Sequence, residues 1–581
     1  MENTEPNSQS FLDRTLASLL RLDIEKILWI MLLIVALLSR TIGLGDRAMS
    51  HDESLHTVYS WQLFDGRGYQ HQPMMHGPLK FILNPVMYFL FGVNDWSARI
   101  LVALFGVAMV ASVWMMRRWL GRTGAFLTAL MYAISPALLY HSRYIRDEVM
   151  LTTLLVFLVI AMFRYLETRS TKWLVWNAVA LGFAFLTMEA SFIFGGLFGI
   201  FLLLAFAAQL WASVWPGDDA GPRRQSFRIL VAIALPLMAV GLALVIFKVK
   251  LVGLAALGTG LVLALLAVIL AVVRWRSKLR AFAELDLIVL FLTLVLPFLS
   301  AIILKAMGWQ ISQFNNPGQI TLSLVWQGFA VLTLLFVISV VIGLLWLRQR
   351  WLIAAGIFWA IELLFFTTFL TNGQGIGTGL IGSLGYWIDQ QEVMRGGQPW
   401  YYFYMLVPLY EFLPLVLFIG GLVAWIASLF GRQGNKGVPA GESQVTGART
   451  HADTPTPPYS DTPTPALSVQ RIFEAFLVFW PLATWAVFTY VGEKMAWHTV
   501  YFAVSMAPLA GWWLGKVFDG INWTEGRRRG IFWLIGMTPL FLIALKALLP
   551  TSTRRPFSGV TVGDLSNSAQ WLLALVVMLV L

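Results

Sequence analysis

The sequence of 581 residues contains no cysteine. Disulfide bridges and thiolate metal centres are therefore excluded, and cysteine usage gives no information on the redox compartment. Charged residues are also scarce, at 12%, whereas 58% of the residues are hydrophobic. This composition leaves too little polar surface to coat a water-soluble particle of this length. We therefore expect the chain to lie in a membrane.

Apolar runs long enough to cross a bilayer recur along the chain. Crossing about 30 Å of hydrocarbon takes roughly 20 apolar residues of helix, and these runs show no period-two alternation of the kind that barrel strands require. The sequence therefore predicts an all-α polytopic membrane protein with about 16 transmembrane helices. These spans are expected near residues 27–44, 173–188, 191–213, 229–247, 251–273, 287–306, 321–347, 352–370, 404–429, 472–490, 499–516 and 531–549, with three more between 96 and 164 and a short run at 568–581.

The net charge of +11 is spread over short interhelical breaks. No continuous basic face is predicted, so we expect no nucleic-acid partner. The positive-inside rule instead places the breaks RRWLGR, GPRRQSFR and RWRSKLR in the cytoplasm. The alternating spans then put the segments near 45–96, 141–148, 371–403 and 491–498 on the extracytoplasmic side of a multi-pass cell-membrane protein.

Four regions follow from this topology. We expect a cytoplasmic segment at 1–26, a transmembrane core at 27–429, a disordered cytoplasmic linker rich in Pro, Thr and Ser at 430–470, and C-terminal transmembrane helices at 471–581. The final run, 568–581, is short for a span, which is compatible with a chain that continues further.

The extracytoplasmic segments carry most of the acidic and histidine residues. Asp52 and Glu53 are flanked by His51 and His56, and His76 begins the element HGPL in the same segment. The second outer break holds the string SRYIRDE, and a late one holds EKMAWH. Charged residues in outer loops are often merely solvated, but their density here favours a site.

A carboxylate can deprotonate a hydroxyl, and Arg, Lys or His can neutralise a phosphate; glycosyl transfer from a lipid phosphate needs both. Two adjacent helical residues face different directions, so only one of Asp52 and Glu53 is expected to act directly. The candidate metal ligands are His51, Asp52 and Asp147, and the ion would be Mg²⁺ or Mn²⁺. No cofactor is implied with certainty, because the spacing of His51 and His56 is not that of a helical zinc pair.

These motifs resemble those of the C-type membrane glycosyltransferase superfamily. The likeness is to its family-39 type, which includes protein O-mannosyltransferases and aminoarabinose transferases, and to the related flippase-associated glycosyltransferase-like group. It covers the first ~170 residues best, with a second patch near 490–512. The resemblance implies a polyprenyl-phosphate-sugar donor, membrane lipid as surroundings, and a protein, lipid or glycan acceptor.

The resemblance also implies roles for individual residues. Asp52, with Glu53, matches the proposed catalytic base in the first outer loop. His76 matches the start of a His-Pro-Pro-Leu element, although Gly77 replaces the first proline. Three other positions match substrate or phosphate contacts of the family: Arg143 and Asp147 in SRYIRDE, and Lys494 in EKMAWH. Apart from the resemblance, Arg395 is a candidate phosphate contact because it lies on the outer side beside two glycines.

Two other classes of function compete with the enzyme. A polyprenyl-linked glycan flippase or transporter would place ionisable residues or broken helices near the bilayer midplane. Here the carboxylates gather at the outer ends of the spans instead. A catalytically silent partner of such machinery would keep the fold but tolerate the loss of Asp52. The enzyme is the favoured prediction.

Overall fold

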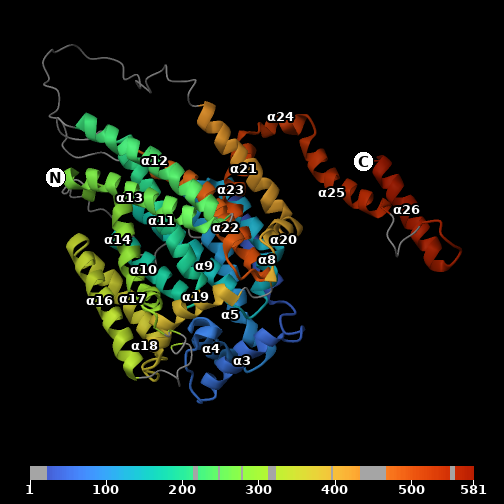
Figure 1. Ribbon diagram of the computed structural model, residues 1–581. Helices are drawn as coiled ribbons and strands as arrows, with labels where there is room; N and C mark the ends of the chain where they lie inside the picture. Colours follow the sequence, from blue (N-terminus) through green and yellow to red (C-terminus); the bar gives the residue numbers. More distant parts are fainter. Residues whose placement is uncertain are drawn as a thin grey trace, which may run out of the picture. The chain divides into compact units, whose positions relative to one another are not determined.

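A computed structural model describes residues 23–213, 220–246, 249–275, 279–309, 311, 314, 322–393, 397–431, 466–549 and 556–580. Every regular element within these ranges is a helix, which confirms the predicted all-α class (Figure 1). The chain forms two compact units, residues 1–515 and 516–581.

The first half of unit 1 contains the following helices: α2 (Ile24–Thr41), α3 (His51–Phe64), η2 (Pro73–Met75), α4 (Leu79–Phe91), α5 (Asp95–Ser112), η3 (Val113–Met116), α6 (Arg117–Leu120), α7 (Arg122–Ile134), α8 (Pro136–Ser142), α9 (Glu148–Thr168), α10 (Thr171–Phe185), α11 (Ala190–Ala212), α12 (Ala220–Ile246) and α13 (Lys250–Trp275). Its second half contains η4 (Leu279–Ala281), α14 (Ala283–Val295), η5 (Leu296–Leu299), α15 (Ser300–Ala306), α16 (Leu322–Trp346), α17 (Gln349–Phe366), α18 (Gly375–Gly377), η8 (Thr378–Gly382), α19 (Ser383–Val393), α20 (Tyr402–Tyr410), α21 (Phe412–Gly431), α22 (Val469–Tyr490), η10 (Ala496–His498) and α23 (Thr499–Gly520).

Unit 2 begins within the last turns of α23 and holds α24 (Trp523–Arg528), α25 (Ile531–Leu548) and α26 (Val562–Val580). Helices α25 and α26 pack against each other. The boundaries predicted from the sequence at 27, 430 and 471 stay predictions. The predicted linker falls largely on 432–465, and the N-terminal segment largely on 1–22, both outside the described residues.

Each predicted span falls on a helix or on consecutive helices. Within the part of the chain that the structure describes, nine helices are long and apolar enough to cross a membrane, or up to ten if the bent pair α7 and α8 counts as one span. Helix α2 differs from these nine because it carries Glu25, Lys26 and Arg40, and α10 because it has only 15 residues. The polytopic class is confirmed, while the count of about 16 stays a prediction.

Helix α9 forms the centre of unit 1, since 89% of its most apolar stretch is buried. It packs against α5, α10, α14 and α22, and nearly all of its side chains are apolar or small (Figure 1). A helix that is apolar on all sides has no preferred solvent face, so it is stable in the middle of a bundle. This position fixes the residues before it, 143–147, at one end of the bundle.

The predicted outer segment 45–96 is largely helical. Helices α3 and α4, drawn in blue in Figure 1, pack side by side and join α2 to α5. Helix α3 begins with a capping box, in which the Ser50 hydroxyl accepts from the Glu53 N–H and the Glu53 carboxylate accepts from the Ser50 N–H. This arrangement satisfies two backbone N–H groups at the helix start and fixes where α3 begins.

The bend between α7 and α8 leads the chain toward the site. The two helices meet at 58° where Ser135 precedes Pro136. At this bend the buried carboxylate of Glu411 accepts hydrogen bonds from the Ser135 hydroxyl at 2.7 Å and from the Ala137 N–H at 2.8 Å. The break is therefore a built feature, and it directs residues 143–147 toward α3.

Candidate functional site

A cavity of about 460 Å³ opens at the end of the bundle where α9 and α11 begin. Its walls come from the start of α3, from residues 74–76, Arg146, residues 188–193, Trp387, and residues between 488 and 498. These six segments are separated from one another along the sequence. The breaks that the sequence assigned to the outer side thus meet in one place.

Asp52 and Glu53 occupy the first turn of α3, about 100° apart around the helix axis. Asp52 lines the cavity, and its side chain is 40% exposed. Glu53 is fully buried and does not line the cavity. The expectation that the two adjacent carboxylates face different surroundings is therefore met by the geometry.

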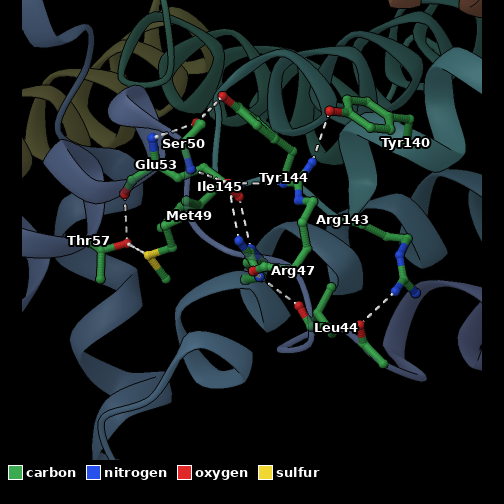
Figure 2. Close-up of polar contacts among 12 residues, drawn as sticks. Leu44, Arg47, Met49, Ser50, Glu53, Thr57, Tyr140, Arg143, Tyr144 and Ile145 are labelled. Carbon is green, nitrogen blue, oxygen red and sulfur yellow. Dashed lines mark hydrogen bonds and ion pairs between the residues drawn. The ribbon is translucent and has the colours of Figure 1, made fainter.

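Glu53 is held by donors on both of its oxygens. Arg99 donates from Nε at 2.9 Å and from Nη2 at 3.1 Å, and Arg47 donates at 2.9 Å. The backbone N–H groups of Ser50 and Ile145 donate at 3.1 and 3.3 Å. Figure 2 shows Arg47, Ser50 and Ile145 around Glu53, between α3 and the 143–147 break.

These donors fix the ionisation of Glu53. Burial alone would raise the pKa of the Glu53 carboxyl, but the hydrogen bonds and charge of Arg99, the Ser50 N–H and the charge of Arg47 outweigh it, and the pKa is lowered. A carboxylate that is charged, buried and already bound by five donors is poorly suited to accept another proton. Its contacts instead attach the break before α9 to the start of α3.

Asp52 forms a direct ion pair with the guanidinium of Arg146, and both side chains line the cavity. Arg146 is nearly buried, and it also contacts the carboxylate of Glu148, with Nη2 3.2 Å from Oε1. Its guanidinium carbon lies 3.7 Å from the centre of the Trp497 ring, which is a cation–π distance. Burial opposes the charge, but Glu148 and Asp52 together raise the pKa of Arg146, so it remains a cation.

His76 forms the second charged pair of the cavity. Its Nδ1 lies 2.7 Å from Oε2 of Glu189, the residue just before α11. Burial alone would lower the pKa of His76, but the charge and hydrogen bond of Glu189 outweigh burial, and the pKa is raised above its ordinary value. His76 also has φ of 68° and ψ of −166°, a region that L-residues rarely adopt and that is found mainly at functional sites.

Gly77 explains how the chain holds this conformation. Its N–H donates to the carbonyl of Thr187 at 3.1 Å, and a Cβ at this position would lie 2.0 Å from the carbonyl oxygen of Leu186. A proline, as in the element that HGPL resembles, would lack the N–H and add a ring in the same space. Glycine is therefore required by the close approach of 76–79 to the break before α11.

Asp147 and Lys80 form a buried ion pair behind the cavity wall. Nζ of Lys80 lies 2.6 Å from Oδ2 of Asp147, and both side chains are almost completely buried. Burial raises the pKa of the Asp147 carboxyl against the opposing charges of Lys80 and His76. Asp147 is thus the N-cap of α9 and a fixed partner of α4, and it is not among the residues that line the cavity.

Two predicted phosphate contacts, Arg143 and Lys494, do not line the cavity as Asp52 and His76 do. Arg143 donates to the carbonyls of Ser39 and Gly43 at 2.8 and 3.0 Å, outside the cavity lining. Lys494 is buried beside the cavity and donates to the Val491 carbonyl at 2.5 Å; burial lowers its pKa. Arg395 lies outside the described residues.

Three histidines line the cavity besides His76: His51, His56 and His498. Burial lowers the pKa of His498 to about 3, and it lowers the pKa of His56 well below the ordinary value. Both imidazoles are therefore neutral at pH 7. His51 is exposed at the start of α3.

The predicted metal ligands do not form a cluster. Among the residues that the structure describes, no group of three or more His, Asp or Glu side chains is arranged to hold a metal ion. Of the candidates His51, Asp52 and Asp147, Asp52 faces Arg146 and Asp147 faces Lys80. A cation beside each carboxylate competes with a metal ion, so these residues fit Mg²⁺ or Mn²⁺ poorly as they stand.

Several residues of the site were not singled out from the sequence: Lys80, Arg146, Glu189 and Trp497. The sequence held a signal for one of them, since Glu189 is the single charged residue between two adjacent predicted spans. An isolated carboxylate there requires a cation or a polar surrounding. The pairing of Lys80 with Asp147 connects positions 67 residues apart and has no local signature.

Comparison with known protein families gives a match for one part of the chain. Residues 75–217 match the model of the family described as dolichyl-phosphate-mannose-protein mannosyltransferase. This stretch includes His76, Arg146 and Glu189 and ends before Lys494; Asp52 precedes it. No curated protein sequence matches the chain.

Among solved structures, ArnT from Cupriavidus metallidurans bound to undecaprenyl phosphate is similar at 15% identity and a TM-score of 0.39, over 95% of this chain and 69% of that one. The apo state of the same protein is similar at 14% identity and a TM-score of 0.43, over 95% and 72%. The oligosaccharyltransferase AglB from Archaeoglobus fulgidus, in complex with an inhibitory peptide and a dolichol-phosphate, is similar at 13% identity and a TM-score of 0.41, over 96% and 54%.

The chain thus spans about half the length of AglB and somewhat more of ArnT. The family match falls on the part of the chain that supplies His76, Arg146 and Glu189 to the cavity. The resemblance predicted from the motifs, to membrane glycosyltransferases of the family-39 type, is confirmed by this match over residues 75–217.

Proposed function

We propose that the protein is an integral membrane glycosyltransferase that moves a sugar from a polyprenyl-phosphate-linked donor to an acceptor. The transferred group would be a hexosyl or pentosyl unit. The acceptor would be a hydroxyl of a protein, lipid or glycan at the cell envelope. The reaction would take place on the extracytoplasmic side of the membrane, where the basic breaks are not found.

One observation carries this proposal. The cavity presents a partly exposed carboxylate, Asp52, together with two basic side chains, Arg146 and His76, which pair with the further carboxylates Glu148 and Glu189 respectively. A volume of about 460 Å³ lies in the range of small-molecule pockets and suits a sugar phosphate. A base and a phosphate-neutralising pair are the groups that glycosyl transfer from a lipid phosphate needs.

In the reaction, a carboxylate oxygen of Asp52 accepts the proton of the acceptor hydroxyl. The acceptor oxygen forms a bond to the anomeric carbon while the bond from that carbon to the phosphate oxygen breaks. The electron pair leaves with the polyprenyl phosphate, and Arg146 and protonated His76 offset the charge that develops there. A single displacement of this kind inverts the anomeric centre.

The remaining predicted contacts have supporting roles in this proposal. Lys494 lies between two cavity-lining residues and would reach a phosphate by releasing the Val491 carbonyl. Glu53 holds the start of α3 so that Asp52 faces Arg146. The predicted Mg²⁺ or Mn²⁺ stays a prediction, which a chelation arm in a transfer assay tests directly.

The absence of cysteine allows a clean test of the sidedness. Single cysteines would be introduced as Ser54→Cys, on the exposed face of α3, and Thr168→Cys, at the far end of α9. A membrane-impermeant maleimide added to whole cells should label the first variant and not the second, with labelling of the second after permeabilisation as the control. Labelling of Thr168→Cys alone would place the cavity in the cytoplasm and overturn the extracytoplasmic part of the proposal.

The activity is tested with purified protein in lipid and polyprenyl-phosphate donors that carry radiolabelled hexoses or pentoses. Transfer with inversion of the anomeric centre is the expected result. Retention of configuration would contradict the single displacement. No transfer from any donor, by protein that remains folded, would favour the silent-partner or flippase alternatives.

A further inference from the structure

A second cavity, of about 380 Å³, lies at the other end of α9. Its lining includes four arginines, one carboxylate and one indole: Arg169, Arg280, Arg348, Arg350, Asp286 and Trp346. They lie in or next to three breaks far apart in sequence, those between α9 and α10, α13 and α14, and α16 and α17. We name this set the arginine pocket.

The arginine pocket and the glycosyl-transfer cavity are separated by the length of α9. Residue 148 begins this helix beside Arg146, and Arg169 follows its last residue. Its 21 residues span about 30 Å at 1.5 Å per residue. This is the thickness of the hydrocarbon core, so the arginine pocket lies at the opposite membrane surface. The positive-inside rule assigns that surface to the cytoplasm.

The one carboxylate of the pocket is already satisfied. Asp286 is buried, and its oxygens accept from the Tyr165 hydroxyl at 2.7 Å, from Nη2 of Arg169 at 3.1 Å and from Nε1 of Trp346 at 2.9 Å. Since it neutralises one of the four arginines, the pocket retains an excess of three positive charges. Its negative charge is therefore not free to bind another cation.

Two of the arginines serve the structure. Besides Asp286, Arg169 donates to the carbonyls of Arg280 and Ala281 at 2.7 and 3.1 Å. Arg350 donates to the Tyr165 hydroxyl and to Oγ1 of Thr171, each at 3.1 Å, and to the carbonyl of Arg169 at 2.5 Å. These bonds fix the floor of the pocket and hold the three breaks together.

The other two arginines are exposed. Within the described part of the chain, no carboxylate pairs with Arg280 or Arg348, although Arg280 lies 5.9 Å from the centre of the Trp346 ring. Arg348 has φ of 53° and ψ of −130°, a costly conformation for a side-chain-bearing residue, immediately before α17. Both guanidinium groups border the same cavity, where their mutual repulsion is relieved by an anion.

We propose that the arginine pocket binds a phosphate group at the membrane surface opposite the glycosyl-transfer cavity, and that Arg280 and Arg348 supply the exposed donors. Guanidinium groups match phosphate oxygens in charge and geometry. Basic pockets between transmembrane helices on the cytoplasmic side suit the headgroups of anionic phospholipids. A soluble phosphate has the same chemistry, so the test separates the two sources. The proposal does not depend on the glycosyl-transfer activity.

The test uses the full-length protein in detergent micelles and measures bound ligand by native mass spectrometry. The probes are dioctanoylphosphatidylglycerol, dioctanoylphosphatidylcholine and inorganic phosphate. The variant is Arg280→Gln combined with Arg348→Gln. The matched control is Arg118→Gln combined with Arg122→Gln, which removes the same charge from exposed positions of another basic break, outside the pocket.

The wild-type protein and the control are expected to bind phosphatidylglycerol in preference to phosphatidylcholine, and the Arg280 and Arg348 variant to bind it at least tenfold more weakly. If inorganic phosphate instead binds as well as phosphatidylglycerol and shows the same loss in the variant, the ligand is a soluble phosphate and the site stands. Equal binding of the anions by the variant and the wild type overturns the proposal, as does an equal loss in the control.

Discussion

Substitution of the two adjacent carboxylates at the start of α3 should have different effects: loss of stability for Glu53 and loss of sugar transfer for Asp52. Glu53→Gln removes the negative charge of a buried carboxylate. The oxygens of this carboxylate accept hydrogen bonds from Arg99, Arg47 and two backbone N–H groups. Arg99 is fully buried and would keep only its hydrogen bonds to the carbonyls of Leu44 and Arg47, so its charge would lose its ion-pair partner. We therefore expect the substitution to act first on stability.

The magnitude follows from the burial of the pair. Removing one partner of a buried ion pair costs about 3–5 kcal/mol, because the remaining charge stays desolvated. The contribution of Arg47 is discounted, since its side chain is 42% exposed and exposed pairs are worth about 1 kcal/mol or less. A loss of about 3 kcal/mol is large beside a typical total of about 5–15 kcal/mol.

The assay is equilibrium unfolding in mixed micelles, followed by circular dichroism, with sugar transfer measured on the same samples. Asp65→Asn is the control, since Asp65 pairs with Arg67 in the same segment and both side chains are exposed. It should unfold with the wild-type midpoint. If Glu53→Gln also unfolds with the wild-type midpoint and yet abolishes transfer, Glu53 acts in the chemistry and our assignment of it to positioning is wrong.

Three further predictions concern the cavity. Glu189→Gln removes the charge that raises the pKa of His76, so the loss of kcat/KM with rising pH, as His76 deprotonates, should begin at lower pH than in the wild type; an unmoved pH profile would exclude His76 as the titrating group. Gly77→Ala should lower the free energy of unfolding by about 1–3 kcal/mol, because its Cβ has no space, and wild-type stability would show that the close approach is not rigid. Arg146→Gln should lower kcat/KM of the folded protein about 100-fold or more and should also destabilise it, because buried Glu148 loses its ion-pair partner, whereas Arg143→Gln should have a much smaller effect on kcat/KM; equal losses of kcat/KM would contradict the placement of the phosphate at Arg146.

The fold class and the grouping of the outer segments could be predicted from the sequence, because hydrophobic length and the distribution of basic residues act locally along the chain. The predicted alternation is consistent with the structure, in which the breaks holding Asp52, Arg146 and Trp497 border one cavity and those holding Arg169 and Arg348 border the other.

The identity of the individual site residues could be predicted less well. Asp52 and His76 line the cavity as expected. The predicted arginine, Arg143, instead binds backbone carbonyls, and the arginine that pairs with Asp52 is Arg146, three positions later. That difference depends on the turn after α8 and on the contact of Glu53 with the Ile145 N–H. Such tertiary contacts leave no pattern in the sequence around them.

The most direct test of the proposed function is transfer of radiolabelled sugar from polyprenyl-phosphate donors by Asp52→Asn, compared with the wild type and with Asp65→Asn. Asp52→Asn removes the base but keeps the size of the side chain in a partly exposed position, so the protein should remain folded while the rate of transfer falls by about 10²–10⁴-fold. Asp65→Asn should transfer at the wild-type rate. Transfer by folded Asp52→Asn at the wild-type rate would contradict the account, because the carboxylate at the centre of the cavity would then have no part in the reaction.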